Sequence, residues 1–358
     1  MKYIFCLCGV LMVLTIYAHG VDLPKALTDA IPDAAEELLE EIDVSTVDGF
    51  ADGVRYLVEY ISGEIGNTFR QRMKGAASVL LVVLLCGVIE GFSRSAEHQQ
   101  PLFLTMAGAL SVTILTVGSL DSLIGLGRET IQELNTFSNV LLPILAAAAA
   151  VSGSVATATL QQVTTVFLAD VLMNLIDGLL MPMVYLYIGI LTASACLPEN
   201  RLGVIADGLK KCIVWILSTS LLLFTLYLSI TRIIAGSVDS ATIRVAKTTI
   251  SGVVPVVGGI IAEASETVLA GAGLMKNTIG IFGMLVILAV CAYPFLQLGS
   301  QYLLYKLTAF LSGVAGAPQL CKLIDGLGGA FGLVLGMAGS CAILLLVSVL
   351  ASVAAVVT

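Results

Sequence analysis

The chain has 358 residues, of which 58% are hydrophobic and 12% are charged, whereas soluble domains carry about 25% charged residues. Its mean hydropathy is +1.01, so the chain lacks the polar side chains that would cover a soluble core, and a soluble enzyme is excluded. The net charge of -8 arises largely between Asp22 and Glu64, where 12 acidic and 2 basic residues lie. The sequence shows no basic face, which excludes nucleic-acid binding.

Residues 1–20 are predicted to be a cleaved signal peptide. Lys2 precedes an apolar core from Tyr3 to Tyr17. Ala18 and Gly20 then place small residues at the two positions that a signal peptidase recognises, so cleavage is expected after Gly20. The alternative is an uncleaved first helix, for which the apolar core is short.

An acidic segment, residues 21–74, follows, and cleavage of the leader would place it outside the cytoplasm. Apolar residues recur in it at spacings of three and four, which predicts an amphipathic helix on the membrane or on a partner. These residues are Phe50, Val54, Leu57, Val58, Ile61, Ile65 and Phe69. Alternatively, this helix packs on the protein's own spans. Arg70, Arg72 and Lys74 mark a membrane boundary after it.

Residues 75–124 are predicted to form a transmembrane hairpin. Two apolar segments, at about 75–92 and 102–124, are joined by the polar turn 93–101. Their lengths are near the roughly 20 residues that cross the hydrocarbon core of a bilayer. Long apolar stretches also occur at 213–231, 278–296 and 327–358. The predicted fold class is therefore all-α, a polytopic transmembrane helical protein.

Comparison of the remaining chain with itself predicts an internal repeat of two membrane units, residues 128–232 and 240–352. The matched positions are Pro143 with Pro255, Pro182 with Pro294, and Asp207-Gly208 with Asp325-Gly326. Chance similarity is the alternative. An odd number of spans in each unit would relate the halves by inversion, whereas an even number would make them parallel, and the sequence leaves both open.

Candidate pathway or packing residues lie around the first matched prolines. Pro143 and Pro255 sit among small residues, and Gly258 and Gly259 follow the second proline. Because proline removes a backbone donor and small neighbours let another helix approach, a broken or re-entrant segment is predicted at each place. The alternative is a kinked but continuous helix.

Glu263 and Glu266 lie three residues apart in an apolar region, so they share one face of a helix. Carboxylates at membrane depth normally face a cavity or a partner, although both residues would also suit an interfacial loop. The Asp-Gly pairs that begin at 177, 207 and 325 are expected to form turns or helix caps rather than sites.

The last apolar span carries a ridge of small residues. Gly328, Gly332, Gly336 and Ser340 recur every four residues. Such a smooth stripe lets another helix come close in a membrane, so it is predicted to be a packing face, either within the subunit or between subunits.

Motifs for catalysis or cofactor binding are not found. The sequence lacks a P-loop, an HExxH motif and a GxSxG motif. It has 2 histidines, and its 8 cysteines show no CxxC spacing, so a histidine-based zinc site is not expected. The chain is therefore expected not to be an enzyme, with no catalytic, cofactor-binding or metal-binding residues.

One stretch resembles a known family. Residues 245–269 (VAKTTISGVVPVVGGIIAEASETVL), continued by residues 276–283 (KNTIGIFG), are similar to the stage III sporulation protein AE family of endospore-forming bacteria. The leader, the acidic segment and the multiple spans are consistent with that family. The resemblance implies a multi-pass protein of the mother-cell membrane around the engulfed forespore, with no established catalytic or ligand residues.

The resemblance also implies partners. These are other membrane proteins of the same sporulation operon and a forespore membrane partner, which form a channel or secretion-like conduit that sustains late forespore development. A homo-oligomer within the lipid bilayer is compatible with this expectation. Two other interpretations remain: a membrane scaffold without its own pathway, and a secondary solute transporter unrelated to sporulation.

Overall fold

The computed structural model describes residues 24–39, 47–95, 102–151, 155–197, 201–253 and 258–353, and every secondary-structure element in these ranges is helical. The predicted signal peptide and Pro255 lie outside the described residues. The elements are α2 (Lys25–Thr28), α3 (Asp33–Leu39), α4 (Val47–Ser95), α5 (Leu102–Val151), α6 (Val155–Leu175), η1 (Ile176–Leu180), α7 (Met181–Cys196), α8 (Arg201–Val253), α9 (Gly258–Val314) and α10 (Pro318–Val353).

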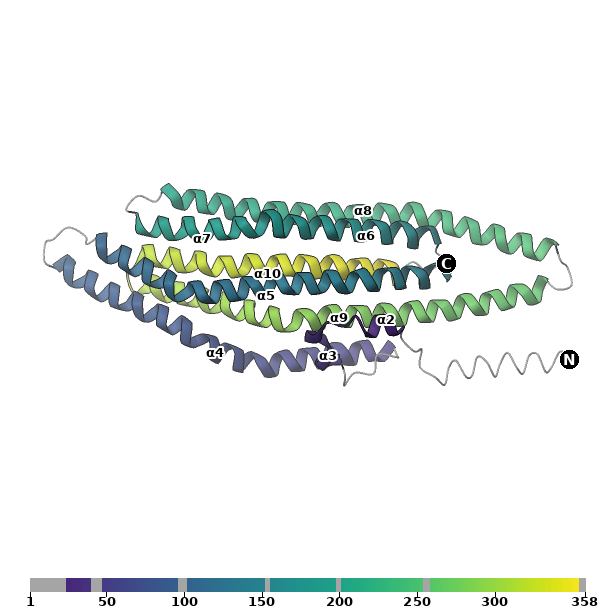
Figure 1. Cartoon of the computed structure of the whole chain (residues 1–358), viewed down its shortest axis with the longest axis horizontal. Helices are drawn as coiled ribbons and strands as arrows, with labels where there is room; N and C mark the ends of the chain where they lie inside the picture. The colour runs from purple at the N-terminus through teal and green to yellow at the C-terminus, as the bar shows by residue number, and fades with distance from the viewer. Residues whose placement is uncertain are drawn as a thin grey trace.

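The long helices lie side by side along one axis (Figure 1). Helices α4, α5, α8 and α9 have between 49 and 57 residues, which corresponds to roughly 75 to 85 Å at 1.5 Å per residue. The hydrocarbon core of a bilayer is only about 30 Å thick. Each of these helices is therefore long enough to cross a membrane and to extend well beyond it.

Within the described ranges, six helical segments are long and apolar enough to span a membrane, in agreement with the prediction of a polytopic helical protein. The segments are Phe50–Gly91, Phe103–Val151, Thr164–Cys196, Leu202–Tyr227, Met275–Val314 and Pro318–Val353. In the most apolar 18-residue stretch of each segment, 72% of the residues of Met275–Val314 and 61% of those of Pro318–Val353 are buried within the protein. In Phe50–Gly91 and Leu202–Tyr227 the buried share is 17%. Helices α9 and α10 thus supply much of the core, and α4 and α8 present outer faces to the surroundings.

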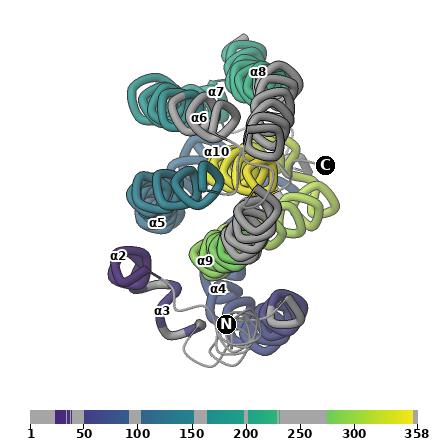
Figure 2. Tube along the Cα trace, turned by 90° about the vertical axis from the view of Figure 1, so that its right-hand side faces the viewer, coloured from purple at the N-terminus to yellow at the C-terminus, as the bar shows by residue number. Residues whose placement is uncertain are grey.

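Helix α10 lies in the middle of the bundle, with other long helices around it (Figure 2). Its glycines permit this position. A Cβ atom at Gly328 would lie 3.0 Å from the Cβ atom of Tyr305, and one at Gly332 would lie 3.1 Å from the ring of Tyr302. The predicted ridge therefore packs against α9 of the same chain, while a Cβ atom at Gly336 would lie 4.0 Å from Leu217 of α8.

The segments predicted from the sequence meet near residue 74 and again near residues 124–128. Both of these predicted boundaries lie inside continuous helices. Helix α4 runs through residue 74, and α5 runs through residues 124–128. No proline interrupts either place, so a change from polar to apolar side chains leaves the helical hydrogen bonds intact. Within the predicted amphipathic segment Leu57 is buried, whereas Val58 and Ile65 are exposed.

Helix α8 also runs without a break through residues 232–240, between the two predicted repeat units. Both units therefore share one helix. Helices α5, α8 and α10 run in the same direction, and the α6–η1–α7 segment and α9 return between them (Figure 1). The matched residues Asp207 and Asp325 lie on helices of the same direction, α8 and α10. If the repeat is genuine, its two halves are thus parallel rather than inverted.

A single π-helical turn, η1, interrupts the segment between α6 and α7. Pro182 lies two residues after the end of this turn and has no N–H group to offer to the carbonyl of Gly178, which explains the widened turn there. Asp177 lies in η1, and its Oδ1 atom is 3.1 Å from Nε of Arg128 on α5. The expectation of a loop turn or helix cap at Asp177 is wrong, because the chain stays helical on both sides.

Candidate functional site: a charged pocket between four helices

A pocket of ≈ 700 Å³ lies where α7, α8, α9 and α10 meet, beside the connections from α7 to α8 and from α9 to α10. Its charged lining consists of three lysines and two aspartates. These residues are Asp207, Lys210, Lys306, Lys322 and Asp325. Ionisable side chains are costly at membrane depth and are usually placed where they face a cavity or each other. The pocket is therefore the strongest candidate site in the described part of the chain.

An ion pair joins α9 to α10 at the wall of this pocket. Nζ of Lys306 lies 2.5 Å from Oδ1 of Asp325 and also donates to the backbone carbonyl of Asp325 at 3.4 Å. The same ammonium lies 5.7 Å from the ring centroid of Tyr302, within the range of a cation–π interaction. Lys306 is thus held by partners on both helices.

The floor of the pocket is formed by α7 packed against glycines of α10. Tyr187 is 1% exposed, and its hydroxyl donates a hydrogen bond of 3.0 Å to the carbonyl of Gly326. A Cβ atom at Gly329 would lie 3.0 Å from Nζ of Lys210 and 3.3 Å from the Tyr187 hydroxyl. The absence of side chains at these glycines lets the lysine of α8 and the tyrosine of α7 reach α10.

Asp207 and Asp325, which the predicted repeat matches, line the same pocket. They are the seventh residue of α8 and the eighth residue of α10, so neither belongs to a turn or a cap. The sequence-based expectation for them is therefore wrong. The signal that pointed to them was their recurrence before two long apolar spans, but only the packing of α8 beside α10 shows that they converge.

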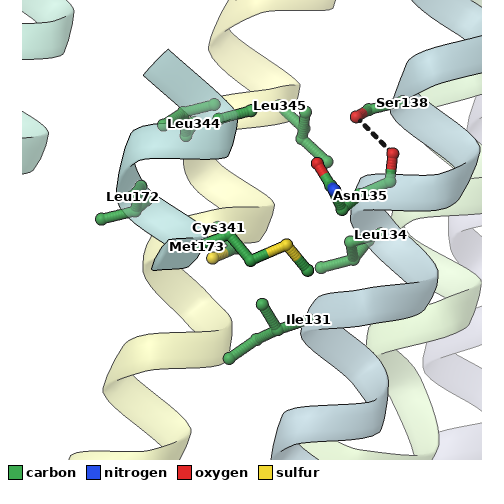
Figure 3. Close-up of a pocket in the computed structure, with 10 residues that line it drawn as sticks. Ile131, Leu134, Asn135, Ser138, Leu172, Met173, Cys341, Leu344 and Leu345 are labelled. Carbon is green, nitrogen blue, oxygen red and sulfur yellow. Dashed lines mark hydrogen bonds between the residues drawn. The ribbon is translucent and has the colours of Figure 1, made fainter. Parts of the chain in front are cut away.

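A second cavity is too small to hold a ligand. It lies between α5, α6 and α10, has a volume of ≈ 20 Å³, and is lined mainly by apolar side chains such as Ile131, Leu172 and Leu345 (Figure 3). Ser138 donates a hydrogen bond of 2.8 Å to the carbonyl of Asn135 at its edge. A space of this size accommodates about one water molecule, so it is a packing feature.

The charged pocket contains side chains that can bind an ion. It combines ammonium groups, carboxylates and the buried Tyr187 hydroxyl, and a thiol is present at Cys321. Cys321 donates to the carbonyl of Ala309 at 3.0 Å, so its thiol is engaged with the backbone. Within the described ranges, no three His, Cys, Asp or Glu side chains gather as metal ligands would.

Comparison with known proteins decides the family. Residues 37–356 match the family model described as stage III sporulation protein AE. The chain belongs to this family. A similar protein is the stage III sporulation protein AE of Bacillus subtilis (strain 168), which is 26% identical over 250 residues. The alignment covers 69% of this chain and 62% of that relative, so less than two thirds of the relative is spanned. No solved structure matches the chain.

The family match confirms the resemblance that residues 245–283 indicated, and it includes the charged pocket and all six candidate spans. With the six apolar helices, it identifies a sporulation-family protein with the features of a multi-pass membrane protein. The family name carries no catalytic activity, and the absence of enzyme activity stays a prediction.

The predicted pathway residues are not brought together with the pocket. Pro143 is exposed inside the continuous helix α5, so this segment is not broken at the proline itself. Gly258, Gly259, Glu263 and Glu266 belong by their backbone to the first turns of α9, but their side chains lie outside the described part of the structure. Lys306, which lines the pocket, lies 40 residues beyond Glu266 on the same helix, so the two places are far apart along α9.

Proposed function

We propose that this protein is a membrane-embedded structural component of the channel-like complex that links the mother cell and the forespore. It would lie in the mother-cell membrane around the engulfed forespore, with other membrane proteins of the same operon and a forespore membrane protein as partners. The family membership supports the role in sporulation. The filled interior of the bundle is the observation that supports a scaffold rather than a channel within one subunit.

Two native cysteines show how the interior is filled. Cys291 on α9 and Cys341 on α10 are buried, and Leu285 and Val334 of the same two helices are 0% exposed. Close packing of this kind leaves no room for a water column. In the proposal, any aqueous passage is therefore formed between subunits or by partner proteins, and not along the α9–α10 seam.

The outer faces of the bundle fit a protein that is surrounded by lipid or partners. Phe103 on α5 is 82% exposed and Trp215 on α8 is 67% exposed. Large apolar side chains exposed along several helices mark a membrane or protein contact surface. The bundle thus offers exposed apolar surfaces around a filled core, which supports the proposal of a scaffold.

The sporulation role is tested by deleting the gene in its native host and following sporulation by microscopy with a late forespore reporter. The expected result is arrest after engulfment with a silent reporter. Reintroducing the intact gene should restore the reporter, which controls for effects on neighbouring genes. Normal spores together with a defect in vegetative solute uptake would reject the proposal and favour a secondary transporter.

The closed interior is tested with a membrane-impermeant thiol reagent on the full-length protein in native membranes. Single-cysteine variants that retain Cys291 or Cys341 are expected to stay unlabelled, because both thiols are buried. A variant that carries Lys322→Cys as its sole cysteine is the positive control, since Lys322 is exposed at the pocket. Rapid labelling of either buried cysteine would show water in the α9–α10 seam and contradict the scaffold.

A further inference from the structure

The lysines of the charged pocket are not all neutralised by its aspartates. Lys306 is paired with Asp325, whereas neither Lys210 nor Lys322 forms an ion pair with another described residue. The five charged groups sum to one positive charge, from three lysines and two aspartates. The pocket therefore has two ammonium groups available for an anion, on two different helices, α8 and α10.

The surroundings of the pocket are apolar and outward-facing. Leu197 and Phe310, which line it, are 46% and 66% exposed, and the neighbouring Val204 is 72% exposed. A soluble anion would gain nothing from this apolar rim. A molecule with a charged head and hydrocarbon chains would place its head among the lysines and its chains against these side chains.

The position along the helices agrees with such a ligand. The pocket lies at the end of the bundle where α8 and α10 begin, and Arg201, Lys210, Lys211 and Lys322 belong to the first turns of these two helices. Basic pockets between membrane helices are known binding sites for anionic lipid head groups.

We propose that this pocket binds the phosphodiester head group of an anionic phospholipid whose head carries free hydroxyls, as in phosphatidylglycerol. Lys210 and Lys322 donate to the phosphate oxygens, and the carboxylate of Asp207 accepts a hydrogen bond from a head-group hydroxyl. The pocket volume of ≈ 700 Å³ lies within the range of about 300 to 1,000 Å³ that is usual for small-molecule sites. This inference stands independently of the role in sporulation.

The test is native mass spectrometry of the purified full-length protein in detergent, titrated with dioleoyl phosphatidylglycerol. The wild-type protein is expected to retain one lipid molecule more strongly than the rest. Each of Lys210→Gln and Lys322→Gln should weaken that binding about fivefold, because one lysine near a lipid phosphate contributes on the order of 1 kcal/mol. The double variant should weaken lipid binding by about the product of the two single fold-changes.

Lys211→Gln is the matched control, since Lys211 is exposed on the same helix next to Lys210 but does not line the pocket. It should bind the lipid as the wild type does, and circular dichroism should show the same helix content for all variants. An equal loss in Lys211→Gln would indicate diffuse surface attraction and overturn the site.

Two other ligands separate the possible sources of the phosphate. Dioleoylglycerol has the same acyl chains without the phosphate, and it should not compete with dioleoyl phosphatidylglycerol for the pocket. Inorganic phosphate and glycerol phosphate should compete only weakly, because they cannot use the apolar rim. Binding of free phosphate as strong as that of the lipid would overturn the lipid assignment, and the absence of any retained lipid would overturn the site as a whole.

Discussion

Replacing Gly127 by leucine is expected to lower the free energy of unfolding by about 3 kcal/mol, the upper part of the usual range for overpacking a filled core. Gly127 is the point where α5 crosses α10. A Cβ atom there would clash with Cγ1 of Val334 and lie 3.7 Å from Cδ1 of Leu298. Val334 is fully buried, and its branched side chain has one strongly preferred rotamer in a helix. The crowding is therefore relieved only by moving the helices apart.

Gly125 provides the control, two residues earlier on the same helix. It is exposed, and a Cβ atom there would have no neighbour within 4 Å. Gly125→Leu should be neutral or slightly stabilising, because leucine is favoured over glycine inside a helix by somewhat less than about 1 kcal/mol. Thermal melting of both variants in detergent measures the difference. Equal melting temperatures would show that α5 does not pack on α10 as described.

The second large effect is expected at the ion pair between Lys306 and Asp325. Lys306→Met removes the ammonium from its position 2.5 Å from the carboxylate and leaves Asp325 facing the pocket without that partner. The two side chains are 31% and 50% exposed, so the cost should lie between that of surface and buried pairs, at about 1 to 2 kcal/mol. Packing of α9 on α10 should loosen accordingly.

A charge swap distinguishes the pair from simple loss of side-chain packing. The double variant Lys306→Asp with Asp325→Lys should recover much of the stability that Lys306→Asp alone loses. Recovery will be partial, because the exchanged lysine no longer lies near the ring of Tyr302. Lys211→Met, which removes an exposed lysine outside the pocket, should leave the melting temperature unchanged. Strictly additive losses in the double variant would argue against a direct interaction between the two charges.

The composition and the long apolar stretches are sufficient for the fold class, and one stretch of characteristic residues is sufficient for the family. A chain with 58% hydrophobic residues must bury its apolar side chains in a membrane, and in a bilayer the backbone must satisfy its own hydrogen bonds, which favours helices. Residues 245–283 carry the family resemblance that the match over residues 37–356 confirms. Both properties reside in runs of consecutive residues, so the amino-acid sequence is enough to predict them.

The location of the strongest candidate site does not follow from consecutive residues. The sequence directs attention to Pro143, where the structure shows an exposed proline inside a continuous helix. From the sequence, Asp207 and Asp325 are expected to form turns or helix caps, because an Asp-Gly pair is common in turns. They are 118 residues apart in the chain, and their convergence depends on two helices that pack through non-local contacts.

The sequence by itself thus determined that this protein is a helical, multi-pass member of a sporulation family, because hydropathy and the family's characteristic residues are written along the chain. The tertiary structure alone decided that the glycine ridge faces Tyr302 and Tyr305 of the same chain. It also decided that Lys306 pairs with Asp325, and that α8 runs without a break from the first predicted repeat unit into the second. The physical reason is that close approach of helices depends on which small residues meet across an interface, and periodicity within one helix does not specify its neighbour.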